Sequence, residues 1–238
     1  MDKCKTYINE FDELIEGGFI PNSANLLAGK TGTGKSSFCM SFAYCGAKEG
    51  ESCVYISTEE TIEDIKKDAT AVFNWDMEKL EKDNLLRFIS IRRDFPTEMS
   101  GEEKKIIQLY ISDISAQIAE AVKEMGAKRV VFDSISTLEL FIRDDYLARN
   151  AIMDLLDKMK ELGVTALLTG TIPEEGGKLS NLGIVEFLVD GVIKLDFVPV
   201  IEKFKRTITV RKMRRINHSS LIHPFEITGD GIKILNIA

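Results

Sequence analysis

Residues 29–36 read Gly29-Lys30-Thr31-Gly32-Thr33-Gly34-Lys35-Ser36, which matches the pattern G-x-x-x-x-G-K-[ST] in full. Glycines in such a loop let successive backbone N–H groups curve around phosphate oxygens without a clash from a Cβ atom. Lys35 is predicted to reach the β- and γ-phosphates of a nucleotide, and the Ser36 hydroxyl to ligate Mg²⁺. The nucleotide-binding residues that we expect are Gly29, Lys30, Thr31, Gly32, Thr33, Gly34, Lys35, Ser36 and Ser37.

The residues on either side of this loop fit the same interpretation. Ala24–Ala28 is a short apolar run typical of a buried strand, and Ser36–Lys48 has the apolar spacing of a helix. A helix that begins at the loop directs the positive end of its dipole at a bound anion. We therefore interpret the stretch as a nucleotide-binding loop rather than a chance glycine-rich turn.

Short apolar runs alternate with helical patterns from residue 24 to residue 169, which predicts βαβ units in a mostly parallel sheet flanked by helices. The further strands of this part are expected at Ser52–Ser57, Leu86–Ile91, Arg129–Asp133 and Val164–Thr169, and the further helices at Glu60–Phe73, Gly101–Met125 and Asp144–Leu162. Four strands with short turns follow Gly183 and predict a C-terminal antiparallel extension: Val189–Leu195, Thr207–Met213, Phe225–Thr228 and Ile232–Leu235. Since no linker divides the chain, we expect an α/β fold with one domain, residues 1–238.

Composition narrows the functional classes. The chain has 238 residues, of which 44% are hydrophobic and 29% charged, as is usual for a soluble globular protein. No apolar run is long enough for a membrane helix, and acidic residues occupy the region where a signal peptide needs an apolar core, so we expect a cytoplasmic protein without a membrane partner. The 31 Lys and Arg against 38 Asp and Glu give a net charge of −7, which disfavours binding of nucleic acid by bulk charge. The four cysteines form no C-x-x-C pair, which favours free thiols over a zinc site.

Acidic residues follow two of the predicted strands. Asp133 ends the strand Arg129–Asp133 and could hold Mg²⁺ through water, although one Asp at a strand end is also compatible with an ordinary turn. Glu59 and Glu60 follow Ser52–Ser57, at the edge of a parallel sheet where ligands bind. Two carboxylates there could orient an attacking water, but acids are equally common at the start of a helix. Spacing alone leaves both interpretations of the glutamates open.

Six segments together resemble the KaiC-type ATPases, a branch of the RecA/RadA superfamily: GKTGTGKS (29–36), STEETIEDI (57–65), FNWDMEKL (73–80), RVVFDSIS (129–136), VEFLVDGVIKL (185–195) and RKMRRINH (211–218). The resemblance covers about residues 8–237 and corresponds to one KaiC domain. It implies a RecA-like P-loop NTPase core that hydrolyses ATP slowly with Mg²⁺. It also implies that Glu59 and Glu60 are catalytic together with Lys35, and that Asp133 is the Walker B aspartate, a metal ligand beside Ser36.

The resemblance also concerns the basic stretch Lys203–His218. Lys212, Arg214 and His218 match the family pattern Lys-x-Arg-x-x-x-His, whose side chains reach the γ-phosphate bound by the neighbouring subunit. This implies a homo-oligomeric ring, typically a hexamer, with ATP between protomers. Two other interpretations remain: a solvated strand face, or a grip on a nucleic-acid backbone. We favour the contacts between subunits.

Three functions follow from these patterns. The first is an oligomeric ATPase that acts as a nucleotide-driven regulator or assembly factor for an unidentified protein partner. The second is a recombinase paralogue that binds single-stranded DNA, which the negative net charge disfavours. The third is a module that binds ATP only to hold a ring together. The complete set of Lys35, Ser36, Glu59, Glu60 and Asp133 argues against the third.

Overall fold

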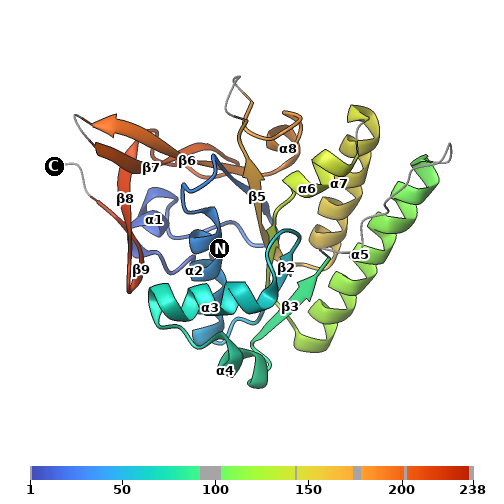
Figure 1. The fold of residues 1–238 in the computed structure, drawn as a ribbon, viewed down its shortest axis with the longest axis horizontal. Helices are drawn as coiled ribbons and strands as arrows, with labels where there is room; N and C mark the ends of the chain where they lie inside the picture. Colours follow the sequence, from blue (N-terminus) through green and yellow to red (C-terminus); the bar gives the residue numbers. More distant parts are fainter. Residues whose placement is uncertain (1, 92–102, 143, 174–177, 201–202, 236–238) are drawn as a thin grey trace.

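A twisted sheet in the order β3-β2-β4-β5-β1-β6-β7-β8-β9 runs through the molecule (Figure 1). The computed structural model describes residues 2–91, 103–142, 144–173, 178–200 and 203–235. The first six strands in this order are parallel: β1 (Ala24–Gly29), β2 (Cys53–Ser57), β3 (Leu86–Ser90), β4 (Arg129–Asp133), β5 (Thr165–Thr171) and β6 (Gly191–Val200). The last three are antiparallel: β7 (Lys203–Met213), β8 (His223–Thr228) and β9 (Gly231–Ile234). The predicted fold class is confirmed.

The antiparallel extension begins one strand later than predicted. We expected Val189–Leu195 to belong to it, but β6 pairs in parallel with β1, so that Asn25 lies opposite Gly191. The extension therefore starts at β7, which returns beside β6 as a long hairpin.

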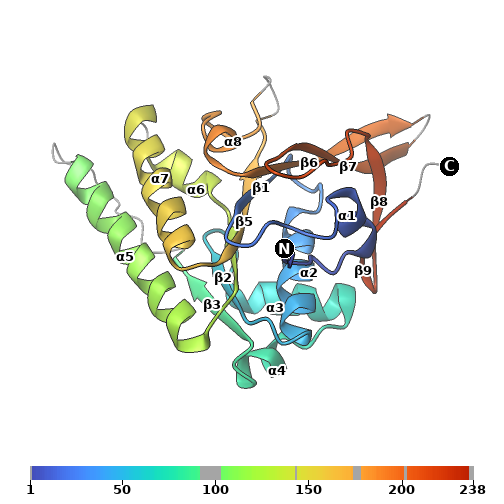
Figure 2. The same cartoon turned by 180° about the vertical axis from the view of Figure 1, so that it is seen from behind.

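Helices cover both faces of the sheet, as Figures 1 and 2 show from opposite sides. One face packs against α1 (Asn9–Leu14), α2 (Lys35–Lys48), α3 (Ile62–Phe73) and α4 (Met77–Lys82), and the other against α5 (Glu103–Met125), α6 (Ser136–Phe141), α7 (Asp145–Glu161) and α8 (Val185–Leu188). Alternate residues of each parallel strand serve the two cores. Leu27 and Tyr55 join the α2 side, whereas Leu26 and Ile56 join the α5 side.

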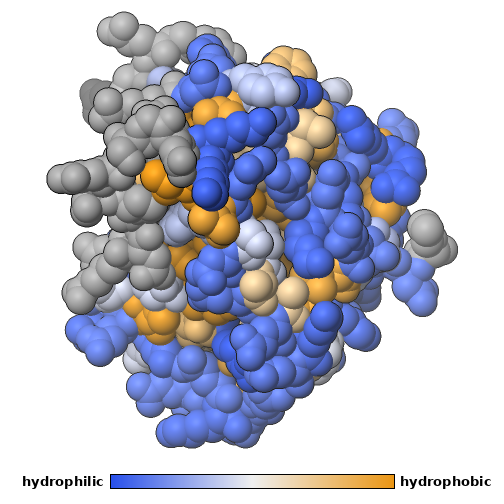
Figure 3. All heavy atoms as spheres, turned by 90° about the vertical axis from the view of Figure 1, so that its right-hand side faces the viewer, coloured by the Kyte–Doolittle hydropathy of each residue, from blue (hydrophilic) through white to orange (hydrophobic). Residues whose placement is uncertain are grey.

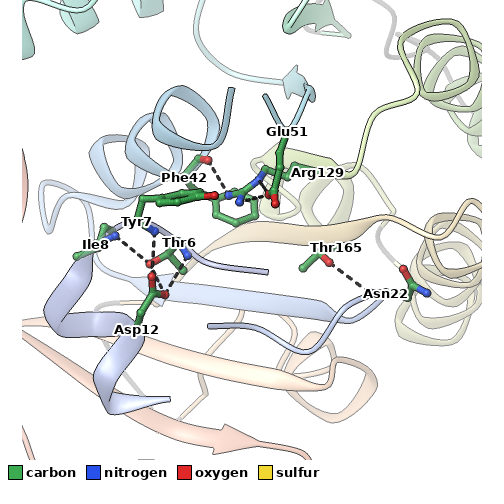
Figure 4. Close-up of polar contacts among 9 residues, drawn as sticks. All are labelled: Thr6, Tyr7, Ile8, Asp12, Asn22, Phe42, Glu51, Arg129 and Thr165. Carbon is green, nitrogen blue, oxygen red and sulfur yellow. Dashed lines mark hydrogen bonds and ion pairs between the residues drawn. The ribbon is translucent and has the colours of Figure 1, made fainter. Parts of the chain in front are cut away.

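A buried arginine lies beneath α2 (Figure 4). The Arg129 side chain is 0% exposed, and its Nε donates to Glu51 Oε2 at 2.8 Å. Its guanidinium also donates to the Phe42 carbonyl and lies over the rings of Phe42 and Tyr7, 4.6 and 5.2 Å from their centroids. A Cβ at Gly46 would lie 2.4 Å from Arg129 Nε, so α2 can pass this close only with glycine there. The ion pair thus fixes α2 against β4.

The outer surface on the side of α5 is mainly hydrophilic, with small apolar areas between charged side chains (Figure 3). Among the described residues, no helix combines the length and the apolar character needed to cross a bilayer.

Candidate nucleotide-binding site

A cleft of about 350 Å³ opens where β1, β2, β4 and β5 end. The carboxyl edge of parallel strands is where ligands bind in open α/β sheets. A larger open groove, about 1040 Å³, runs along α3 and α4, but it includes none of the predicted site residues. The cleft brings together most of the residues that the sequence singled out, with four others: its lining is Thr31, Gly32, Gly34, Lys35, Ser36, Ser37, Glu59, Glu60, Asp133, Ser134, Thr171, Arg206 and Ile227.

The loop before α2 presents backbone donors to this cleft. Gly34 is the N-cap of α2 with φ of +105°, a conformation that glycine adopts without strain, and no side chain caps the helix. The first N–H groups of α2 are therefore available to an anion. Thr33 is buried, and its hydroxyl donates to the Lys30 carbonyl at 2.7 Å, so this side chain shapes the loop instead of facing the cleft.

Lys35 extends along the loop. Its Nζ donates to the carbonyl oxygens of Gly29 at 2.9 Å and Lys30 at 3.0 Å. Burial lowers the pKa of the Lys35 ammonium, while the nearby Asp133 and Glu59 carboxylates raise it. A phosphate would compete well for this ammonium, because hydrogen bonds between two charged groups are stronger than those to neutral carbonyls.

Two hydroxyl groups hold the Asp133 carboxylate in the floor of the cleft. Thr169 Oγ1 donates to Oδ1 at 2.5 Å, and Tyr55 Oη donates to Oδ2 at 2.9 Å. Burial and the Asp133 charge raise the pKa of Tyr55 well above its ordinary value, so the phenol stays a donor. With the Ser36 hydroxyl in the same cleft, this carboxylate forms the oxygen donor set that Mg²⁺ prefers beside nucleotide phosphates. Within the described part of the chain, no group of three or more His, Cys, Asp or Glu side chains could hold a metal by itself.

Glu59 and Glu60 stand just before α3 and beside the cleft. The N-cap of α3 is Thr61, whose side chain accepts an N–H of the first turn, so neither glutamate serves as the cap. Both line the cleft. Glu59 Oε1 accepts hydrogen bonds from Ser134 Oγ at 2.7 Å and Thr137 Oγ1 at 3.1 Å. Burial raises the pKa of the Glu60 carboxyl, which makes it a better proton acceptor near neutral pH.

Arg206 is a cation of this cleft that sequence reasoning did not assign to it. Its Nη2 lies 3.5 Å from the Gly32 carbonyl oxygen, and its guanidinium lies 5.3 Å from the centroid of the Phe197 ring. Its buried Nε has no hydrogen-bond partner among the described residues. The sequence placed Arg206 only in the basic stretch, but its alternation with the buried Ile208 and Val210 of β7 is a signal that it faces inward.

Lys212, Arg214 and His218 lie outside the cleft of their own chain. Lys212 Nζ donates to two carbonyl oxygens at the end of α8, at 3.1 and 2.7 Å. Arg214 Nη1 lies 3.4 Å from Asp190 Oδ1, and His218 Nδ1 lies 2.9 Å from the next carbonyl oxygen. The structure therefore does not bring these three side chains to the nucleotide loop of the same chain.

The family model described as "ATPase: KaiC" matches residues 4–238. The chain therefore belongs to the KaiC ATPase family, and this membership supports an ATP-binding function. Its relatives include proteins named UPF0273. The one from Thermotoga maritima is 33% identical over 234 residues, covering 98% of this chain and 95% of that protein. The one from Pyrococcus furiosus is 33% identical over 236 residues, covering 97% and 92%.

A solved structure resembles the whole molecule. The crystal structure of a KaiC-like protein from Pyrococcus horikoshii OT3 matches with a TM-score of 0.85 and 36% identity, covering 99% of each chain. The predicted RecA-like core is thereby confirmed.

Proposed function

We propose that the chain is a Mg²⁺-dependent ATPase that converts ATP and water to ADP and phosphate slowly, within a homo-oligomeric ring, typically a hexamer. The observation that carries this proposal is the convergence of Lys35, Glu59, Glu60 and Asp133 in one cleft at the end of the parallel strands. The cycle would serve a nucleotide-driven regulator or assembly factor that acts on a protein partner.

Each side chain has a role in an in-line attack of water on the γ-phosphate. The loop N–H groups and Lys35 stabilise the charge that develops on the phosphate oxygens. Glu59 and Glu60 orient the water and accept its proton. Mg²⁺ held by Ser36 and Asp133 would neutralise further phosphate charge when it is bound.

Lys212, Arg214 and His218 are assigned to the site of the neighbouring chain. Support for this comes from their place outside the cleft and from their match to the family pattern. A cation supplied by a second subunit stabilises transition-state charge and makes hydrolysis depend on assembly.

The basic stretch offers less to nucleic acid than its sequence suggests. Arg206 faces the nucleotide loop of its own chain, and the net charge of −7 disfavours binding of nucleic acid by bulk charge. We therefore keep the ATPase proposal ahead of single-stranded DNA binding. A steep loss of DNA affinity with rising salt would reverse that order.

Complementation between two inactive variants tests the shared site. Lys35→Ala removes the nucleotide-loop cation, and Lys212→Ala/Arg214→Ala removes the cations offered to the neighbour. Each variant alone should lose ATPase activity by about 10³-fold or more. Mixed before assembly at equal amounts, they should recover roughly a quarter of the parent activity, since that share of heterologous interfaces contains both intact halves.

Lys205→Ala is the matched control, because Lys205 is an exposed cation of β7 that does not line the cleft. It should keep parent activity. Light scattering with and without Mg-ATP measures the assembly of every sample. Rings that form from the mixture but show no recovered activity would contradict the shared site.

A further inference from the structure

A buried carboxylate on α6 plays no part in the proposed reaction. Glu139 is only 2% exposed, and its two carboxylate oxygens accept the backbone N–H groups of Asn181 and Leu182, each at 3.1 Å. Burial raises the pKa of the Glu139 carboxyl, and the two N–H donors act against that rise. A carboxylate is costly to bury unless such donors are present, so this side chain ties α6 firmly to the turn before α8.

A second glutamate holds the same turn from its other side. Glu186 of α8 accepts the Leu179 N–H at 3.0 Å and the Ser180 hydroxyl at 2.7 Å. Ser180 Oγ in turn accepts the Ile184 N–H at 3.2 Å. The turn is therefore bonded to both α6 and α8, and a shift of one helix changes the position of the other.

Lys212 is held by carbonyl oxygens of α8 and of the residue that follows it. Lys212 Nζ donates to the Glu186 carbonyl at 3.1 Å and the Val189 carbonyl at 2.7 Å. The N-terminal end of α6 lies beside the cleft, where the Thr137 hydroxyl donates to the Glu59 carboxylate. The short helix α6 thus contacts Glu59 of the cleft directly. Through Glu139 and the turn, α6 is also connected to α8, which holds Lys212 outside the cleft.

We propose that Glu139 is a positioning residue, which sets where α8 presents Lys212 to the nucleotide site of a second copy of the chain. This inference rests on the proposed role of Lys212 between subunits. Glu139 touches no substrate and acts only through the turn and α8.

Glu139→Gln tests the inference. The amide keeps the size of the side chain, but its NH₂ group cannot accept a hydrogen bond from one of the two backbone N–H groups. We expect kcat of the assembled protein to fall about 10- to 100-fold with little change in KM for ATP, as for a misplaced catalytic group. The same substitution in a Lys212→Ala background should cause no further loss of kcat, since the group that Glu139 positions is then absent.

Asp12→Asn is the matched control (Figure 4). Asp12 is also a buried carboxylate with a raised pKa, and it accepts the N–H groups of Thr6 and Tyr7 at 2.9 and 3.0 Å. Asp12 belongs to α1, which packs on the opposite face of the sheet from α6 and Glu139. It should lower the midpoint of thermal unfolding as Glu139→Gln does, without changing kcat in either background.

The outcomes distinguish a failure of the proposed role of Lys212 from a failure of the proposed role of Glu139. If Lys212→Ala itself leaves kcat unchanged, the proposed role between subunits fails, and the inference falls with it. If Lys212→Ala lowers kcat but Glu139→Gln has no effect, or has an equal effect in both backgrounds, only the inference is overturned. Should Glu139→Gln not fold, Glu186→Gln loosens the same turn and must show the same dependence on Lys212.

Discussion

Replacing Arg206 with alanine tests whether each chain supplies a cation to its own site in addition to Lys35. The Arg206 guanidinium borders the cleft 3.5 Å from the Gly32 carbonyl oxygen. One hydrogen bond from a charged group to a phosphate is worth about 1.5–3 kcal/mol. At 1.36 kcal/mol for each factor of ten, its loss lowers kcat/KM about 10- to 160-fold.

The fold should tolerate this change. The buried Nε of Arg206 has no hydrogen-bond partner among the described residues, so removing the side chain breaks no strong hydrogen bond. We expect a cost below about 1 kcal/mol and therefore a fall of less than about 4 °C in the midpoint of thermal unfolding. Phosphate release at varied ATP concentration, with melting followed by circular dichroism, measures both effects.

Mixing experiments then show whether Arg206 acts in the nucleotide site of its own chain or in that of the neighbouring chain. Arg206→Ala should regain activity with Lys212→Ala/Arg214→Ala, because the two changes affect different halves of the interface. It should regain none with Lys35→Ala, because both variants damage the same half. Recovery with Lys35→Ala, or a change in kcat/KM below about threefold, would refute the assignment.

Three further predictions concern the cleft and the buried ion pair. Glu59→Gln/Glu60→Gln should lower kcat about 10²- to 10⁴-fold while ATP affinity in an equilibrium titration stays the same; an unchanged kcat would exclude both carboxylates from the reaction. ATP affinity, measured by calorimetry, should be unchanged near neutral pH and should fall as the pH rises through the lowered pKa of Lys35, because only the charged ammonium attracts phosphate. An affinity that stays constant up to pH 10.5, the ordinary pKa of a lysine, would contradict this prediction. Glu51→Ala leaves the Arg129 guanidinium buried without its carboxylate, which should cost about 3–5 kcal/mol in urea unfolding, and a loss below about 1 kcal/mol would show that the ion pair is not needed.

The sequence predicted the long elements well because apolar spacing is a local signal. Arg129–Asp133 is a strand with the bounds that we expected, and α2, α3 and α7 begin within two residues of their predicted starts. The predicted start of the helix at Gly101 lies outside the described residues. The helices α1, α4, α6 and α8 were not predicted. Each has six residues or fewer, which is too short for the helical period to show.

The sequence predicted the site residues only where they stand at the ends of predicted strands. The nucleotide loop and Asp133 stand at strand ends, so their common edge follows from the parallel sheet. Ser134 and Thr137 hold Glu59 across a separation of more than 70 residues. Such partners depend on which strands lie side by side, and β2 next to β4 cannot be read from either strand alone.

The division of the basic side chains of β7 depends on one irregularity in the sheet. Simple alternation would place Arg206, Ile208, Val210 and Lys212 on the same face of the strand. The pairing with β6 passes from Val210 directly to Lys212, which leaves Arg211 without an opposite residue. Such a bulge turns the following side chains to the other face, so Met213 joins the α2 core while Lys212 meets α8. Because of that single extra residue, Arg206 faces the chain's own nucleotide loop and Lys212 does not. Deleting Arg211 would remove the bulge and leave Lys212 directly after Val210, opposite Val192 on the α8 face, so the deletion variant should keep most of its ATPase activity. Loss of activity from a ring that still forms would contradict this account.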